Sequence, residues 1–270
     1  MTDQTRPSRA ARAMGAVLIL GLATTGCAAV GEEATGPTHT AQLVEDGALT
    51  VCSDMPYAPF ESMKNGKPVG FDVDLVRQVA TELRLRLAVK DVDFDAIQSG
   101  DALNSDKCDV AISAMTINGE RARWLDFSSP YFDAAQALVV PKDSGIDSLD
   151  GLAGRRIGVQ GGTTGELYVT DNAPDGEVVP FEDAAGLQAA LAAGEVDAAV
   201  FDNTIVGPVL AGNSDLEVSA EFDTGEQYGM AVKKNGNVEL LRSINKVLAT
   251  LEADGGYDEI YATWFGKAKA

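Results

Sequence analysis

Polar and aromatic side chains gather in four segments of this 270-residue chain, each of which begins in or follows a short apolar run. They contain a single arginine, together with acids, hydroxyl residues, aromatic faces and a glycine-rich turn. A guanidinium group can hold a carboxylate with two parallel hydrogen bonds, and a carboxylate is the natural partner of an ammonium group. The set is therefore poorly suited to acid–base catalysis and well suited to holding a zwitterion. The segments are S-D-M-P-Y-A-P-F at 53–60, S-A-M-T-I-N-G-E-R at 113–121, G-G-T-T-G at 161–165 and A-V-F-D-N at 199–203.

Several of these residues also have a purely structural interpretation. Arg121 could be a solvated charge on a helix surface, which is the commoner situation for an arginine. Asp202 could cap the helix that we expect to follow it. Tyr57 and Phe94 could be aromatic residues of the core. Asp72 lies close to the start of a predicted helix, where an acid favours the N-terminus, so we expect a structural role for it.

The elements that must position these residues follow an alternating pattern of strands and helices. Such an order predicts mostly parallel, doubly wound sheets, and two series of this kind in one chain imply two lobes with a cleft between them. Ligands of open α/β sheets bind at the carboxyl ends of strands, where the four segments fall. The expected strands are 49–53, 87–92, 110–114, 156–160, 178–181 and 198–201, and the expected helices are 73–85, 94–100, 166–170, 183–193, 238–251 and 257–265.

The first 26 residues read as an export signal, with basic residues before an apolar run at 13–23 that is too short to span a bilayer comfortably. The run ends in T-T-G-C, which resembles a bacterial lipobox with Cys27 as the lipidated residue. The alternative is an ordinary signal peptide with an incidental cysteine. The small, polar segment 27–46 then predicts a flexible tether, so we expect an exported protein anchored to the outer face of the membrane by its lipid.

Cys52 and Cys108 remain after export to an oxidising compartment, where a pair of cysteines favours a disulfide over two free thiols. The only histidine, His39, lies in the tether, which argues against histidine-dependent catalysis and against the usual histidine metal sites. We expect neither a metal nor a cofactor. The formal net charge of −20 excludes nucleic acid as a partner.

Three ordered motifs make the sequence resemble a known family. They are G-F-D-V-D-L-V-R-Q-V-A-T-E-L at 70–83, W-L-D-F-S-S-P-Y at 124–131 and G-Y-D-E-I-Y-A-T-W-F-G at 256–266. The resemblance, which covers roughly residues 47–266, is to the polar amino acid-binding proteins of ABC transporters, the group with the glutamine, histidine and lysine/arginine/ornithine binders.

The resemblance implies a two-lobed, periplasmic-binding-protein-like fold of type II. Each lobe would be a mostly parallel sheet flanked by helices, with a two-segment hinge near 133–138 and 224–228. Lobe 1 would comprise residues 47–134 plus 228–270, and lobe 2 would comprise residues 135–227.

The resemblance also assigns roles at the zwitterion's backbone end. Arg121 falls at the family's carboxylate-binding arginine, and Thr116 at a hydroxyl residue that helps hold the ligand's charged end. Thr164 would present its backbone N–H to the carboxylate, with Thr163 beside it. Asp202 falls at the acid that pairs with the α-ammonium group.

At the other end, Tyr57 and Phe94 would cover the ligand's side chain. Asp54 falls at the position that reads polar or cationic side chains, with Gln160 lining the same end. Ser113 belongs to the same binding segment, and Ala114 replaces a serine of some cationic amino acid binders, so the ligand stays open among glutamine, arginine, lysine and related compounds.

The resemblance implies a monomeric solute-binding protein that delivers an amino acid to an ABC permease with its ATPase. One alternative is an enzyme on the same fold, such as a dehydratase of an amino acid-like substrate. It would need Asp54 as general acid or base, without a histidine or lysine partner. The other alternative is a ligand-sensing module without a transporter.

Overall fold

The computed structural model describes residues 42–266. The predicted export signal 1–26, the predicted lipidation site Cys27 and His39 lie outside the described residues. Within residues 42–266, none of the helices has the length and apolar character needed to cross a membrane. Residues at the end of the predicted tether already contact the domain, because the Val44 amide donates to Asp109 Oδ1 at 2.7 Å.

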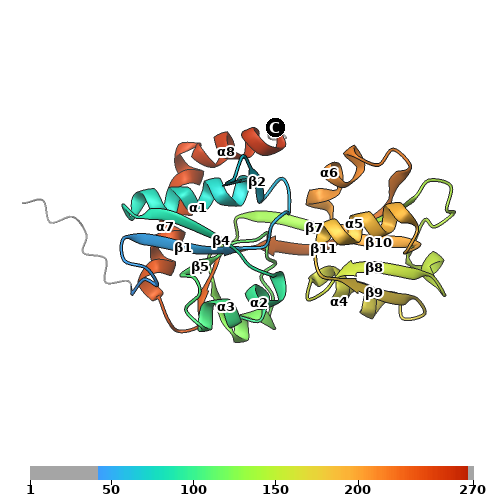
Figure 1. Ribbon diagram of the computed structural model, residues 1–270, viewed down its shortest axis with the longest axis horizontal. Coiled ribbons are helices and arrows are strands. Elements are labelled where there is room, and N and C mark those ends of the chain that lie inside the picture. Colours follow the sequence, from blue (N-terminus) through green and yellow to red (C-terminus); the bar gives the residue numbers. More distant parts are fainter. Residues whose placement is uncertain (1–41, 267–270) are drawn as a thin grey trace, which may run out of the picture. The chain divides into compact units, whose positions relative to one another are not determined.

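Two five-stranded sheets, one in each lobe, organise the described chain (Figure 1). In each sheet one strand runs antiparallel to both of its neighbours and the other strands are parallel to one another, as the prediction of mostly parallel sheets requires. The first sheet has the order β4 (Arg86–Asp91), β1 (Ala48–Ser53), β5 (Val110–Ala111), β12 (Ala231–Lys233), β6 (Leu125–Phe127). The second has the order β11 (Leu216–Tyr228), β7 (Phe132–Pro141), β10 (Ala198–Asp202), β8 (Arg156–Gln160), β9 (Glu177–Phe181).

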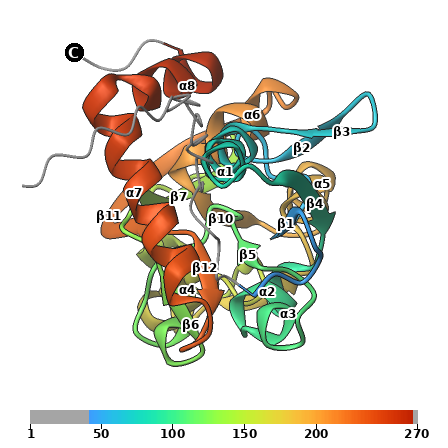
Figure 2. The same ribbon diagram turned by 90° about the vertical axis from the view of Figure 1, so that its left-hand side faces the viewer.

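Helices cover both faces of each sheet, and a small hairpin precedes the first long helix (Figure 1). Figure 2 shows α1, α7 and α8 on one side of lobe 1, where they contact one another, and α2 and α3 on the other side. The remaining elements are β2 (Ser62–Lys64), β3 (Lys67–Val69), α1 (Phe71–Glu82), α2 (Phe94–Gln98), α3 (Asp101–Asn104), α4 (Thr164–Asn172), α5 (Ala184–Ala193), α6 (Val206–Ala211), α7 (Val238–Asp254), α8 (Gly256–Phe265) and the short 3₁₀ helices η1 (Arg121–Arg123), η2 (Leu149–Leu152) and η3 (Asn203–Ile205).

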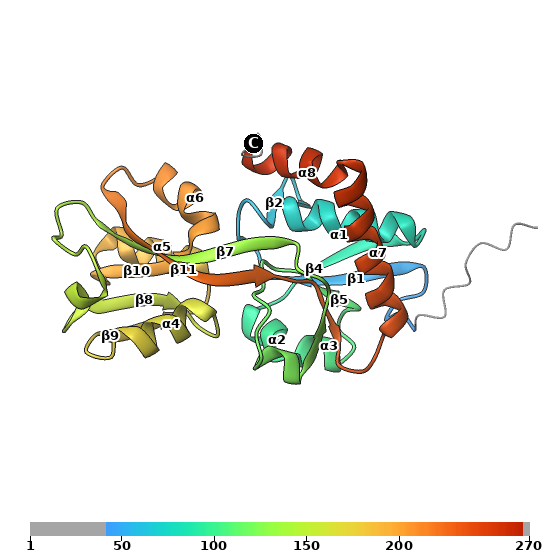
Figure 3. The same cartoon turned by 180° about the vertical axis from the view of Figure 1, so that it is seen from behind.

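The chain passes between the two sheets twice, through β7 and β11, which lie side by side in Figure 3. These two strands pair antiparallel, with Ala134 opposite Glu226. The pairing shifts register between Phe222 and Glu226 and is regular again towards lobe 1. Neither strand appears among the strands expected from the sequence.

An aromatic cluster anchors this pair of strands in lobe 1. Phe60 is fully buried, and its ring centroid lies 5.0 Å from that of Phe132 on β7 and 5.4 Å from that of Tyr228 on β11. Phe71 and Phe265 complete the cluster around Phe60. The ends of both connecting strands are therefore held by apolar packing in lobe 1.

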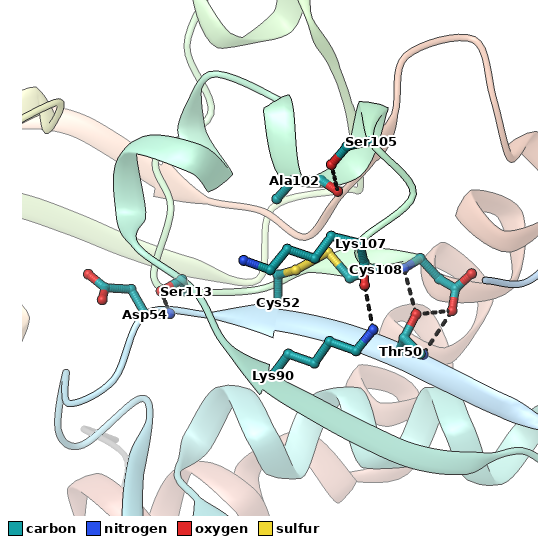
Figure 4. Close-up of a disulfide and its surroundings, with 10 residues drawn as sticks. Thr50, Cys52, Asp54, Lys90, Ala102, Ser105, Lys107, Cys108 and Ser113 are labelled. Carbon is teal, nitrogen blue, oxygen red and sulfur yellow. Dashed lines mark hydrogen bonds between the residues drawn. A yellow bond between two sulfur atoms is a disulfide. The ribbon is translucent and has the colours of Figure 1, made fainter. Parts of the chain in front are cut away.

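The disulfide predicted between Cys52 and Cys108 is present and lies within lobe 1 (Figure 4). It joins β1 to the residues just before β5, with a Cα–Cα distance of 5.8 Å. Beside it, Asp109 accepts hydrogen bonds from the Thr50 amide and hydroxyl at 2.8 and 2.5 Å. Both interactions fix the same pair of strands, whose ends carry Asp54 and Ser113.

Replacing both cysteines with alanine should lower the free energy of unfolding by about 2–5 kcal/mol, because the crosslink restricts a long loop of the unfolded chain. Denaturant unfolding of the variant and of the oxidised wild type measures this difference. The mass of the wild type should increase by one hydrogen per cysteine when the protein is reduced. An unchanged mass would show that the thiols are free.

Candidate ligand-binding site

One pocket brings together every residue that the sequence predicted to bind ligand. It lies where strands of both sheets end, because Asp54 follows β1, Gln160 ends β8 and Asp202 ends β10. The loops after β5 and β8 complete the wall. The lining residues are Asp54, Tyr57, Phe94, Ser113, Ala114, Thr116, Arg121, Gln160, Thr163, Thr164 and Asp202.

Arg121 is buried in the pocket wall, with 3% of its surface exposed, so it is not a solvated surface charge. Its Nη1 donates to the Thr116 carbonyl at 2.8 Å, and its Nη2 donates to the Gly162 carbonyl of lobe 2 at 2.9 Å. The guanidinium carbon lies 5.1 Å from the centroid of the Phe94 ring. Burial lowers the pKa of Arg121 to about 10, and the nearby Asp202 and Glu226 counteract that effect. The group therefore stays charged and keeps further N–H donors for an anion.

Asp202 does not cap the helix that follows it, since its side chain makes no capping hydrogen bond to η3. Instead, it accepts hydrogen bonds from Gln136 Nε2 at 2.7 Å and from the Tyr228 hydroxyl at 2.5 Å. Burial, together with the charge of Glu226, raises the pKa of Asp202 to about 6. An ammonium group in the pocket would favour its charged form.

The loop G-G-T-T-G is shaped by the start of α4. Thr163 is the N-cap residue, and its hydroxyl accepts from the Glu166 amide at 3.3 Å. Glu166 in turn accepts from the Gly162 amide at 2.8 Å. Gly162 has φ +71°, a backbone conformation that favours glycine, and a Cβ there would also displace the side chain of Asp95. This turn places the Gly162 carbonyl against Arg121.

Glu226, on β11, was not predicted from the sequence. Its Oε2 accepts from the hydroxyls of Thr116, at 2.7 Å, and Thr164, at 2.5 Å, which come from opposite lobes. Its Oε1 accepts from Gln136 Nε2 at 2.9 Å and from the Thr224 hydroxyl at 2.7 Å. Burial opposes its charge, but these four hydrogen bonds outweigh burial and lower the pKa of Glu226. The sequence offered no signal for it beyond its position in the predicted return segment 224–228.

The opposite end of the pocket is acidic. Asp54 Oδ2 accepts from Gln160 Nε2 at 3.0 Å, across the lobes. Burial raises the pKa of Asp54 to about 6; Gln160 acts against this, and the nearby acids add to it. A positive charge at this end would relieve the repulsion among these carboxylates. The adjoining pocket is lined by Asp54, Met55, Asp91, Asp93, Glu182 and Asp183.

Two fully buried carboxyl groups lie behind the wall of the pocket. Glu61 Oε1 accepts from the Ser113 hydroxyl at 2.7 Å, and Asp72 Oδ2 accepts from the Ala114 amide and the Tyr131 hydroxyl, both at 2.8 Å. Asp72 therefore does not serve mainly the helix N-terminus, as expected from the sequence, but holds the segment that lines the pocket. Ala114 adopts φ +42°, a strained conformation for a residue with a side chain.

The remaining oxygens of this pair, Glu61 Oε2 and Asp72 Oδ1, are buried without a hydrogen-bond donor. Burial and mutual repulsion raise the pKa of Glu61 well above its ordinary value, and burial raises that of Asp72 to about 7. Asp72 has two donors and Glu61 has one, so we infer that Glu61 carries a proton that is shared with Asp72. One proton between the two oxygens satisfies both.

A proton held by Glu61 predicts how stability depends on pH. The unfolded chain releases this proton near the ordinary pKa of 4.5, whereas the folded protein keeps it to higher pH. The stabilisation is therefore fully present below that pKa and is lost as pH rises through the folded value. Glu61→Gln mimics the protonated group, so the free energy of unfolding should fall less steeply in the variant as pH rises above the ordinary pKa of 4.5. The measurement is the free energy of unfolding from urea titrations at each pH. If its dependence on pH is the same for the two proteins, Glu61 holds no proton.

A pocket that pairs a buried guanidinium with partly buried carboxyl groups between two α/β lobes is suited to a small zwitterionic solute. The chain belongs to the bacterial extracellular solute-binding proteins, family 3, whose model matches residues 49–267. Family membership places it among solute-binding proteins rather than enzymes, so the dehydratase alternative is not retained. Among the described residues, no group of three or more His, Cys, Asp or Glu side chains could hold a metal ion.

Several proteins that are named for the amino acid they bind are similar to this protein over most of its length. The ABC transporter glutamine-binding protein GlnH of Bacillus subtilis is 33% identical over 208 residues, which is 74% of each chain. The ABC transporter arginine-binding protein 1 of Escherichia coli is 33% identical over 215 residues, covering 77% of this chain and 87% of that one. A solved structure of an ancestral arginine-binding protein bound to glutamine is 41% identical, with a TM-score of 0.78 over 83% of this chain and all of that one. The predicted periplasmic-binding-protein fold of type II is thus confirmed.

Proposed function

We propose that this protein captures a polar or cationic L-amino acid between its lobes and delivers it to the permease of an ABC importer. The observation that carries the proposal is the pocket itself, in which the buried guanidinium of Arg121 and the partly buried carboxyl group of Asp202 converge. Arg121 and Asp202 are charges that proteins bury only with partners, and an amino acid supplies both partners at once.

The ligand's orientation follows from the donors and acceptors of the wall. Its carboxylate meets the free N–H groups of Arg121 and the backbone N–H of Thr164 at the start of α4, where the helix dipole favours an anion. Its α-ammonium group meets Asp202. Its side chain then extends along Tyr57 and Phe94 towards the acidic end at Asp54.

A cationic side chain fits that acidic end best, and relatives named for arginine support this preference. Gln160 beside Asp54 also offers an amide to a neutral polar side chain, as relatives named for glutamine would require. Arginine and glutamine are therefore the first ligands to test.

The two connecting strands provide the closing motion. Lobe 1 (47–134 plus 228–270) and lobe 2 (135–227) would turn about β7 and β11, and the ligand would favour the closed form because it contacts both lobes. The closed monomer would then dock on the permease that works with its ATPase.

Binding can be tested by calorimetry with arginine, glutamine and lysine against the wild type and Arg121→Ala. Removing the guanidinium should cost roughly 2–5 kcal/mol of binding free energy, because it leaves the ligand's carboxylate buried without its partner. Arg123→Ala, which removes an exposed arginine of the same short helix, is the matched control and should bind normally. Near-normal affinity of Arg121→Ala would remove Arg121 from the site.

Cys27 supports a lipid anchor through the T-T-G-C motif that precedes it. In cells that express the chain with its first 26 residues, the wild type should fractionate with the membrane and incorporate a labelled fatty acid. Cys27→Ser should be released without the label. Equal release of both proteins would leave an ordinary export signal as the correct interpretation.

A further inference from the structure

Glu226 is the point at which hydroxyl groups of the two lobes converge. Its Oε2 lies 2.7 Å from Thr116 Oγ1 and 2.5 Å from Thr164 Oγ1, and the two hydroxyl oxygens lie 3.4 Å apart. Both threonines line the ligand pocket, whereas Glu226 is not among the lining residues. Glu226 therefore lies behind the pocket wall and acts on the pocket through its hydrogen bonds to Thr116 and Thr164.

A threonine hydroxyl has one hydrogen to donate and two lone pairs that accept. Glu226 is a carboxylate and can only accept hydrogen bonds, so each hydroxyl must donate its single hydrogen to Glu226. Thr116 Oγ1 and Thr164 Oγ1 are then left with acceptor capacity alone. Charge-assisted hydrogen bonds of this length are strong enough to prevail over the 3.4 Å contact between the hydroxyls.

The Glu226 carboxylate is itself fixed from its other side. Gln136 Nε2 donates to Glu226 Oε1 at 2.9 Å and also to Asp202 Oδ1 at 2.7 Å, so one buried amide links the two acids. Thr224 donates to the same Glu226 oxygen at 2.7 Å. The acids and both hydroxyls thus form one network whose pocket-facing atoms are acceptors.

We propose that Glu226 is a positioning residue that sets the polarity of Thr116 and Thr164, so that both hydroxyls accept from the α-ammonium group of the ligand. With Asp202 they would form a subsite of acceptors that holds the ammonium group and repels the carboxylate. The carboxylate is thereby directed to Arg121, and the ligand binds in one orientation. This inference rests on the proposed function.

Glu226→Gln tests the inference, because glutamine keeps the size of the side chain but adds an N–H that can donate to the hydroxyls and reverse their polarity. Calorimetry would use L-arginine and L-glutamine and the corresponding carboxylic acids that lack the α-amino group. The variant should lose about tenfold or more in affinity for the amino acids, the loss expected for one strong hydrogen bond, and little or none for the des-amino acids. Asp202→Asn should likewise lose more affinity for the amino acids than for the des-amino acids, because Asp202 is the proposed direct partner of the ammonium group.

A double-mutant cycle separates action through the hydroxyls from action through space. Thr116→Val and Thr164→Val, made together, remove both hydroxyls and nearly preserve volume. If Glu226 acts through them, Glu226→Gln should cause little further loss in that background. Additive losses would overturn the inference, because Glu226 would then act by its own charge.

Controls keep the outcomes distinct. Glu221→Gln changes an exposed acid of the same strand and should leave every affinity unchanged. If Glu226→Gln does not fold, the threonine double variant is tested alone. It must then lose more affinity for the amino acids than for the des-amino acids, and equal losses of affinity would overturn the inference. A wild type that binds no amino acid would overturn the proposed function as well. If the wild type binds and Glu226→Gln leaves the ratio of the affinities for amino acids and des-amino acids unchanged, this inference alone is overturned.

Discussion

The buried charge of Arg121 is the constraint on which the site depends. A guanidinium away from water is costly unless its N–H groups find acceptors and its charge finds opposite charges. Backbone carbonyls from both lobes, at Thr116 and Gly162, accept two of its hydrogen bonds, and the positive φ at Gly162 favours a glycine in that loop. Asp202 and Glu226 supply negative charge. The remaining donors of the guanidinium are available to the carboxylate of the proposed ligand.

Two glutamates behind the pocket, Glu61 and Glu226, have pKa values that are shifted in opposite directions. Glu61 accepts a hydrogen bond from Ser113, and burial raises its pKa well above the ordinary value. Glu226 receives four, and its pKa is lowered. Burial thus favours the protonated form of Glu61 behind Ser113, whereas its hydrogen bonds favour the charged form of Glu226 behind Thr116. Residue type alone would not separate these roles.

Much of the fold could be predicted from local patterns in the sequence, whereas the pocket lining was predicted partly from strand ends and partly from the resemblance to a known family. Apolar periodicity indicated the regular helices and strands, and strand ends located residues such as Asp54 and Asp202. The long strand β11 was missed, because its alternation of exposed and partly buried residues includes many polar side chains and a glycine. Glu61 and Glu226 were missed for a different reason. Their roles depend on partners 52 and 110 residues away, which no local pattern reveals.

The disulfide has a mechanical consequence. It ties two segments of the same sheet, two residues before Asp54 on one side and five residues before Ser113 on the other, and it does not reach lobe 2. Within the described residues, the polypeptide backbone is thus the only covalent connection across the joint. The crosslink therefore restricts lobe 1 alone and adds no covalent constraint to β7 and β11. Reduction of the disulfide would loosen the lobe 1 side of the pocket and leave the pairing of the two connecting strands unchanged.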